Sequence, residues 1–378
     1  MDTAFPSPRL TESLPTLPAA AYSDPAWYDR ERRAIWWRDW VCAGRLNDMP
    51  RGRMRGLDIA GAPVLVVRAE DGTVSAFHNA CRHRGAELCP KGDRPAGRLI
   101  TCPYHAWSYA AADGRLVATG HARPAADFRR DNHGLKPVAT RVWAGFLFLS
   151  LADTPPPLAP DMGLAALDNW PMDSLVTGHC HVRELACNWK VFWENYNECL
   201  HCPGIHPELC DMVPVYRRGI MSLREADDWR PGDTALPPLK DGARTWTMTG
   251  KPCGPEFPGL TPSERVAGYT FVTTVPSLYV VGHVDYVRAV RLEPTGPTTT
   301  RLTAEWLFPP ETLAQPAFSA AQVAEFASLV LEQDAEAAEM NQRGLASPAH
   351  QQGTLMPEEF DIRRFHDWVS GRLAEERP

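Results

Sequence analysis

Two Cys-plus-His pairs mark the first half of the sequence: Cys81-Arg82-His83 and, after eighteen further residues, Cys102-Pro103-Tyr104-His105. Around them, from about residue 41 to residue 150, short apolar or alternating runs are separated by Gly and Asp turns. The pair Asp71-Gly72 lies between two strand-like runs, which is a strong signal for a β-hairpin. We therefore expect residues 41–150 to form a small β domain whose loops carry both pairs.

The residue types in these pairs suit a 2Fe–2S cluster. Thiolates of Cys81 and Cys102 would hold one iron, and imidazoles of His83 and His105 the other. Neutral imidazoles leave less negative charge on the cluster than thiolates would, so the cluster accepts electrons readily. The alternative is a structural zinc site, but zinc fingers place a helix between the pairs, whereas these pairs fall in β-rich loops. We expect Cys89, between the pairs, to be an ordinary core or loop cysteine.

The remaining elements indicate a β-rich sheet covered by helices. A helix is expected over residues 24–40, with Asp24 as N-cap and Pro25 at its first position. The three prolines at 155–157 predict a stiff linker. Beyond it we expect helices and strands over these ranges: strands 179–187, 269–281, 284–293 and 299–308, and helices 188–201 and 320–343.

A second group of candidate metal ligands follows the expected helix 188–201, which Cys202-Pro203-Gly204 should end. His201 would lie in its last turn and His206 just beyond the break, so both imidazoles could turn toward one point. Taken alone, the two would equally well be a helix-end histidine and a loop histidine.

The expected helix 320–343 supplies a carboxylate. At 100° per residue, Asp334 lies about 20° from the centre of the apolar face that contains Val323 and Val330. A carboxylate there is costly unless it is paired, and a buried bond to Arg or Trp is one way to pair it. Iron is the other, because two His and one carboxylate form a facial triad that leaves coordination positions open.

With both groups of candidate ligands, the sequence resembles the Rieske non-haem iron oxygenases. Both Cys/His pairs are matched in full, with Trp107 just after them. The resemblance also covers four later features: Asn-Trp-Lys at 188–190, Glu-Asn-Tyr at 194–196, the His-x4-His pair, and the late carboxylate followed by residues 341–345. It therefore spans nearly the whole chain.

The resemblance implies an α+β protein with two parts. One is a Rieske β domain with a 2Fe–2S cluster at 41–150. The other is a helix-grip catalytic domain with an antiparallel sheet at 151–378, which would hold Fe(II) through His201, His206 and Asp334. The N-terminal arm and helix, residues 1–40, would pack on the catalytic domain.

Glu198 stands three residues before His201, which would be the same helix face. In most of the family an Asp here bridges a Rieske His of a neighbouring subunit to a His of the mononuclear iron. The resemblance thus implies a head-to-tail homotrimer, with His105 of one chain reaching His201 of the next through Glu198. Family members with Glu here look like the enzymes acting on carnitine and glycine betaine. A solvated helix residue is the alternative for Glu198. Asn195 and Glu194 belong to the same motif, and we count Asn195 with Glu198 as candidate catalytic residues.

The resemblance implies an O2-dependent terminal oxygenase, either a monooxygenase or a dioxygenase. A separate reductase with flavin and NAD(P)H would supply electrons, because the chain has no glycine-rich dinucleotide fingerprint. The first hypothesis is a monooxygenase that hydroxylates a carbon next to a quaternary or N-methylated nitrogen and releases an aldehyde. The second is an aromatic ring hydroxylase or O-demethylase. The third is a Rieske electron-transfer protein without oxygenase activity. Such a protein would need no second iron, so the intact set of His201, His206 and Asp334 argues against it.

Either kind of substrate would need an aromatic pocket. The catalytic half offers several aromatic side chains, although most such residues are core: Trp193, Tyr196, Tyr269, Phe271, Tyr279 and Tyr286. The polar insertion 227–262 could act as a lid, but it carries no recognisable motif.

Composition excludes several other roles. The net charge of -7 gives no basic surface for nucleic acid, and no apolar run approaches the ~20 residues that span a bilayer. The start, residues 1–6, lacks the pattern of an export signal. The ten irregularly spaced cysteines then favour reduced thiols or metal ligands over disulfides. We therefore expect a cytoplasmic protein.

Overall fold

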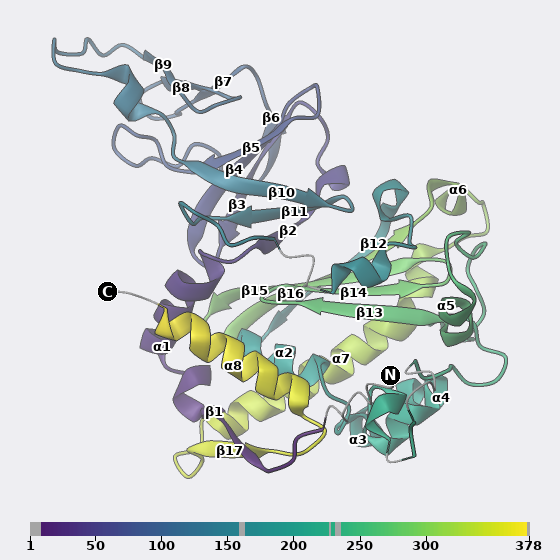
Figure 1. Ribbon diagram of the computed structural model, residues 1–378. Coiled ribbons are helices and arrows are strands. Elements are labelled where there is room, and N and C mark those ends of the chain that lie inside the picture. Colours follow the sequence, from purple (N-terminus) through teal and green to yellow (C-terminus); the bar gives the residue numbers. More distant parts are fainter. Residues whose placement is uncertain (1–8, 159–162, 227, 231–235, 376–378) are drawn as a thin grey trace, which may run out of the picture. The chain divides into compact units, whose positions relative to one another are not determined.

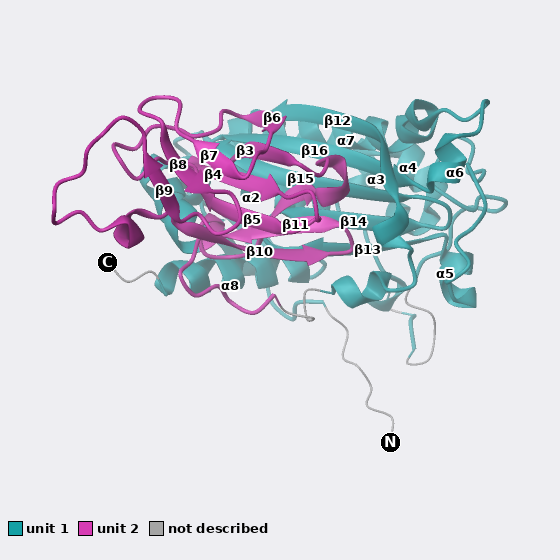
Figure 2. Ribbon diagram, turned by 90° about the horizontal axis from the view of Figure 1, so that it is seen from above, with its two compact units in different colours: residues 1–34, 159–378 teal, residues 35–158 magenta. Residues whose placement is uncertain are grey.

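The protein is described here by a computed structural model that covers residues 9–158, 163–226, 228–230 and 236–375. It divides into two compact units, residues 35–158 and residues 1–34 with 159–378 (Figure 2). The β domain expected at 41–150 lies within the first of these. In the part of the chain that is described, no helix has both the length and the apolar character needed to cross a bilayer.

The unit of residues 35–158 is built from antiparallel strands (Figure 1). A seven-stranded sheet has the order β2-β11-β10-β5-β4-β3-β6, and a three-stranded sheet the order β7-β8-β9. The hairpin predicted at Asp71-Gly72 is confirmed: it joins β4 and β5, with Val64 opposite His78 and Gly72 at φ +93°. The strand bounds are β2 Val41–Arg45, β3 Arg53–Ile59, β4 Ala62–Arg68, β5 Val74–His78, β6 Gly92–Pro95, β7 Leu99–Thr101, β8 Trp107–Ala110, β9 Leu116–Thr119, β10 Pro137–Trp143 and β11 Phe146–Ser150.

The larger unit contains a five-stranded antiparallel sheet with the order β12-β16-β15-β14-β13. The strand predicted at 299–308 is confirmed as β16. The run 269–281 is two strands instead of one, because residues 275–277 turn the chain and pair β13 back onto β14. The bounds are β12 Val176–Leu185, β13 Tyr269–Thr274, β14 Leu278–His283, β15 Val287–Gly296 and β16 Thr299–Phe308.

Helices cover one face of this sheet (Figure 1). The long helix α7, Ala320–Leu345, packs on β12 and on α2, Trp189–Tyr196, and α2 also touches β15. Ser319 caps α7 and Asn188 caps α2 through their side-chain oxygens. The other helices are α3 Cys202–Ile205, α4 Pro207–Met212, α5 Pro262–Ala267, α6 Pro310–Leu313 and α8 Phe360–Ala374.

The helix predicted at 188–201 is wrong in its last turn. It ends at Tyr196 because Asn197 bonds the carbonyl of Trp193 through its own side chain, at 2.6 Å, and leaves helical geometry. A non-helical turn follows. Cys202-Pro203-Gly204 does not end a helix but begins the short helix α3, where Pro occupies a first-turn position that needs no N–H donor.

The cysteine prediction also needs correction. Cys199 and Cys202 form a disulfide across the turn between α2 and α3. The spacing Cys-x-x-Cys brings the two sulfur atoms together once the helix has ended, which the sequence reasoning did not consider. Cys89 is not part of this disulfide and is fully buried in the core of the smaller unit.

The N-terminal segment is tied to the larger unit. Strand β1, Leu14–Pro18, pairs with β17, Gln352–Leu355. Helix α1, Pro25–Glu31, has Asp24 as its N-cap, as predicted, but it continues as a π-helical turn over Arg32–Trp36 and does not reach residue 40 as an α-helix. At its end, Glu31 is fully buried and forms an ion pair of 2.7 Å with the fully buried Lys190 of α2. This pair locks α1 against α2.

Candidate metal centres

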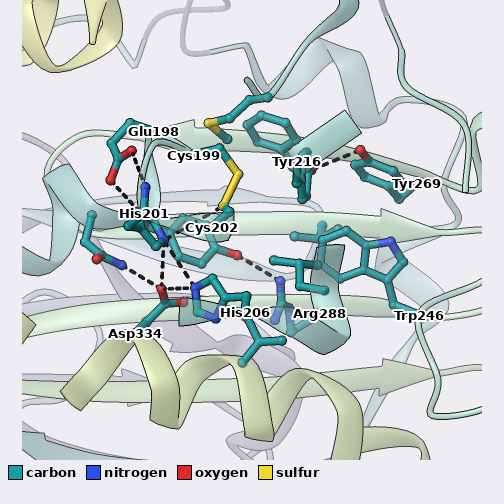
Figure 3. A pocket seen from close by; sticks show the side chains of 17 residues that line it. Glu198, Cys199, His201, Cys202, His206, Tyr216, Trp246, Tyr269, Arg288 and Asp334 are labelled. Atoms are coloured by element: carbon teal, nitrogen blue, oxygen red, sulfur yellow. Dashed lines mark hydrogen bonds and ion pairs between the residues drawn. A yellow bond between two sulfur atoms is a disulfide. The ribbon is translucent and has the colours of Figure 1, made fainter. Parts of the chain in front are cut away.

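Three side chains from two separate segments meet in the larger unit: His201, His206 and Asp334 (Figure 3). His201 immediately precedes α3, His206 lies between α3 and α4, and Asp334 is in the middle of α7. His206 Nε2 lies 2.9 Å from Asp334 Oδ1 and 3.2 Å from His201 Nε2. His201 Nε2 lies 3.4 Å from the same carboxylate oxygen. Among the described residues, no other group of three or more His, Cys, Asp or Glu side chains lies closely enough together to share one metal ion.

These separations fit an iron ion. Metal–ligand bonds of about 2.1 Å at right angles place neighbouring ligand atoms about 3.0 Å apart. The three atom pairs, at 2.9, 3.2 and 3.4 Å, are close to that value. Two imidazoles and one carboxylate on one face are the donor set of non-haem Fe(II), with the opposite positions left open.

Each histidine is held by an oxygen at its Nδ1. His206 Nδ1 lies 2.8 Å from Gln333 Oε1, and Gln333 Nε2 donates to Glu208 Oε2 at 2.9 Å. His201 Nδ1 hydrogen-bonds Glu198 Oε1. The Nδ1 atoms are therefore engaged as donors, which leaves each Nε2 as the nitrogen available to a cation. Gln333 was missed in the sequence, where it is only the polar neighbour of Asp334.

The electrostatics favour a positive charge at this point. Asp334 is 4% exposed, and Asn195 Nδ2 donates to its Oδ1 at 2.7 Å. Burial raises the pKa of Asp334, but the hydrogen bonds of His201 and His206 outweigh burial and lower that pKa to about 2. Burial lowers the pKa of His201, whereas Asp334 and Glu198 raise it to about 9. Without metal, a proton on His201 supplies positive charge beside the two carboxylates, and a bound cation would replace that proton.

Glu198 contacts His201 from the turn between α2 and α3, not from a helix face as predicted. Its Oε2 accepts hydrogen bonds from the backbone N–H of Leu200 and, at 3.4 Å, of His201. The side chain is 11% exposed. Glu198 is thus fixed against His201 and is not a solvated helix residue, yet one side of it can be reached from the surface.

The other four candidate ligands lie in two loops of the smaller unit. Cys81 and His83 follow β5, and Cys102 and His105 lie between β7 and β8. The cysteines are 3% and 2% exposed, whereas His83 is exposed, His105 is half-buried, and their rings lie 4.7 Å apart. A tetrahedral zinc site requires four ligand atoms around one point, and the ligand atoms of these four residues do not meet in that way. Buried thiols and outward imidazoles fit a cluster in which the two cysteines hold one iron and the two histidines hold the other.

A tyrosine that sequence reasoning missed supports this loop pair. Tyr109 Oη lies 3.1 Å from Cys81 Sγ and accepts the backbone N–H of Arg82 at 3.0 Å. The ring of His83 stacks on Trp107, with centroids 4.8 Å apart. Hydrogen bonds to cluster sulfurs and rings that fix the ligands are the levers by which proteins tune such clusters.

The triad of His201, His206 and Asp334 opens onto a cavity with about 520 Å³ of space between its walls, including the mouth. Of the aromatic residues proposed for a pocket, Tyr196, Tyr269 and Phe271 line it. Trp193, Tyr279 and Tyr286 do not line it; Trp193 stacks on Phe365 with centroids 4.0 Å apart. The cavity wall also contains residues that the sequence did not single out: Tyr216, Trp246 and Arg288. Trp246 comes from the insertion 227–262, whose sequence gave no signal for it.

Two family models match the chain. "Ring hydroxylating alpha subunit (catalytic domain)" matches residues 172–375, and "Rieske [2Fe-2S] domain" matches residues 39–129. Together they include all seven candidate metal ligands. The first match contains the triad and Glu198, and the second contains both Cys/His pairs.

The relatives point in the same direction. The chain is 33% identical to the glycine betaine monooxygenase oxygenase subunit of Chromohalobacter salexigens, over 96% of this chain and 88% of that protein. It is 31% identical to the carnitine monooxygenase oxygenase subunit of Escherichia coli K12, over 53% of this chain and 55% of that protein. The crystal structure of the quaternary ammonium Rieske monooxygenase CntA has the same fold, with a TM-score of 0.72, 21% identity, and 94% and 95% of the two chains covered.

Proposed function

The chain belongs to the Rieske non-haem iron oxygenases as an oxygenase subunit, and we propose that it hydroxylates a carbon next to a quaternary or N-methylated nitrogen. The cofactors of this family are a 2Fe–2S cluster and a mononuclear iron. The observation that carries the proposal is an open metal triad facing a cavity whose wall contains five aromatic side chains. Similarity to the glycine betaine and carnitine enzymes supports it.

The residues that would hold the cofactors follow from the geometry above. His201, His206 and Asp334 would bind the iron, which supports O2 reduction and oxygen transfer when it is present. Asn195 would position Asp334, and Gln333 would position His206. Two further pairs would bind the cluster: Cys81 with Cys102, and His83 with His105.

The reaction balances with one O2 and two electrons. An N-methyl group, O2, two electrons and two protons give an N-hydroxymethyl group and water. The C–N bond of that product then breaks, releasing the amine with one methyl group fewer, formaldehyde and a proton. If the hydroxylated carbon is instead a methylene on a longer substituent, the same C–N cleavage releases the corresponding aldehyde.

The cavity can hold an ammonium group without a counter-ion. Aromatic faces attract cations, and the attraction strengthens where water is excluded. Tyr216 and Tyr269 are fully or almost fully buried and bond to each other at 3.0 Å through their hydroxyl groups, which keeps both rings in place. The ring of Trp246 lies 5.0 Å from that of Tyr269. A trimethylammonium group would therefore meet a rigid aromatic wall.

Electrons would come from a separate flavin- and NAD(P)H-dependent reductase, and the need for NAD(P)H would place the enzyme in the cytoplasm. The proposed assembly is a homotrimer. In it, His105 of one chain passes an electron to Glu198 of the next chain, which contacts His201 of that same chain. Two observations support this route: the imidazole pair of the cluster loops faces outward, and Glu198 contacts His201 while part of its surface remains accessible.

Product analysis tests the substrate class. The iron-loaded protein and a reductase would be given glycine betaine, carnitine, choline or benzoate, and O2 uptake would be compared with the aldehyde formed. We expect an ammonium compound to yield aldehyde in proportion to O2. A hydroxylated aromatic product with no aldehyde from any ammonium compound would favour an aromatic hydroxylase instead. Uptake without product reports only uncoupled turnover.

Iron analysis tests the ligand assignment. A fully loaded chain should contain about three irons, two in the cluster and one in the triad, whereas an electron-transfer protein would contain two. Asp334→Ala should lose the single iron and its activity while the visible and EPR signals of the cluster remain. Retention of all three irons in this variant would contradict the assignment of Asp334.

A further inference from the structure

We propose that Arg288 binds a carboxylate group of the substrate, so that the enzyme selects zwitterionic ammonium carboxylates over ammonium alcohols. This inference rests on the proposed function and specifies its substrate class. Arg288 is the second residue of β15, lines the same cavity as the triad, and is 2% exposed.

Within the described part of the chain, the Arg288 guanidinium has no negatively charged partner. Its Nη2 donates to Tyr196 Oη at 2.9 Å, but its Nε and Nη1 have no hydrogen-bond partner among the described residues. It also forms no ion pair with any described carboxylate. A nearby imidazole, His283, brings no negative charge, and burial together with Arg288 holds its pKa well below the ordinary value. A buried cation without an anion is costly, so a ligand anion is the partner that this position lacks.

The neighbouring arginine on the same strand shows the contrast. Arg291 is also almost buried, but it pairs with Glu293 at 3.1 Å and with Glu305 at 3.7 Å, and it does not line the cavity. The two buried arginines of β15 thus differ in their surroundings. Arg291 faces carboxylates of the protein itself, whereas Arg288 faces the cavity, where a ligand carboxylate could bind.

The cavity places Arg288 within reach of a small substrate at the triad. Adjacent residues of α2 serve the two ends: Asn195 bonds Asp334 at 2.7 Å, and Tyr196 bonds Arg288 at 2.9 Å. Consecutive Cα atoms are only about 3.8 Å apart. Figure 3 shows Arg288 on the side of the triad that faces Trp246, and its guanidinium carbon lies 5.7 Å from the centre of the Trp246 rings.

This arrangement matches a molecule with a cation and an anion separated by one or a few carbons. The aromatic wall receives the ammonium group. The guanidinium receives the carboxylate through two parallel hydrogen bonds, one from the second hydrogen of Nη2 and one from Nε or Nη1, each of which shares an edge with Nη2. An ammonium alcohol such as choline offers no anion, so its positive charge is repelled by Arg288. The same residue therefore attracts one substrate class and disfavours the other.

The test compares glycine betaine with choline, which share the trimethylammonium group and differ in carboxylate against hydroxymethyl. Binding to the iron-loaded enzyme is measured by calorimetry without O2, and kcat/KM by coupled aldehyde release. Wild type should prefer glycine betaine. Arg288→Met should weaken glycine betaine binding about 10- to 100-fold and leave choline binding unchanged or stronger. Arg288→Lys keeps the charge but not the planar fork, and should lower the preference about tenfold.

A control variant separates selection from folding. Arg291→Met removes a buried cation of the same strand outside the cavity, and it should keep the wild-type preference for glycine betaine. If Arg288→Met does not fold, Arg288→Lys decides alone.

The outcomes distinguish the two proposals. Wild type that turns over neither compound, nor carnitine, overturns the proposed function and this inference with it. Wild type that turns over both compounds equally, or an Arg288 variant with an unchanged preference, overturns only the role of Arg288.

Discussion

Replacing Gln333 with Met is expected to weaken iron binding at the triad without touching a metal ligand. Gln333 Oε1 accepts the Nδ1 hydrogen bond of His206 at 2.8 Å, and Glu208 orients the Gln333 amide at 2.9 Å. Met has a similar length and helix propensity but offers no comparable acceptor. The His206 ring then loses the contact that directs its Nε2 toward Asp334.

The expected size of the effect follows from this one contact. Loss of a hydrogen-bond partner behind a metal-binding histidine typically lowers metal affinity about 10- to 100-fold. Each factor of ten corresponds to about 1.4 kcal/mol of binding free energy. His206 is 1% exposed, so water cannot readily replace the lost acceptor. We therefore expect a loss of about 1.4 to 2.8 kcal/mol.

The assay is an anaerobic Fe(II) titration of protein whose cluster is intact, with the visible absorbance of the cluster as internal standard. Glu336→Gln is the matched control, because Glu336 lies exposed on the same helix two residues after Asp334. That variant should bind iron as wild type does. An affinity of Gln333→Met within about threefold of wild type, well below the expected loss, would refute the reasoning that Gln333 orients His206.

Three further outcomes are expected. Glu198→Gln should keep both metal centres but slow turnover about tenfold or more, because the neutral amide no longer holds His201 as an anion does; stopped-flow oxidation of the cluster measures this, and an unchanged rate would rule out the bridge. Lys190→Met should destabilise folding by about 3–5 kcal/mol, measured by urea unfolding, because Glu31 stays buried without its partner; a loss below about 1 kcal/mol would contradict the importance of the pair. Burial raises the pKa of Glu225 from 4.5 to about 7, so its stabilising contribution is full below pH 4.5 and is lost as the pH rises through 7. The stability of Glu225→Gln relative to wild type should therefore increase as the pH rises from 5.5 to 8, as measured by the urea midpoints of both proteins. A difference that stays constant across that range would argue against the raised pKa of Glu225.

Local signals identified the elements that carry the two candidate metal centres. The Asp71-Gly72 hairpin, strand 299–308 and the long helix near 320–343 were predictable because each depends on nearby residues: turn conformation, alternation and helical periodicity. The position of Asp334 on the apolar face followed from the same periodicity. The end of α2 was not predictable in this way, because a side chain of the helix itself, Asn197, competes for its backbone.

The sequence by itself determined the types of metal ligand, their grouping into two pairs and a triad, and the family, since coordination chemistry restricts residue type and local spacing. Only the tertiary structure decided which groups stand behind those ligands and around the cavity. Three features depend on contacts between segments far apart in the chain: Gln333 beside His206, Trp246 from the insertion in the cavity wall, and Arg288 with no carboxylate partner among the described residues. Such contacts are set by packing, which leaves no local pattern in the sequence.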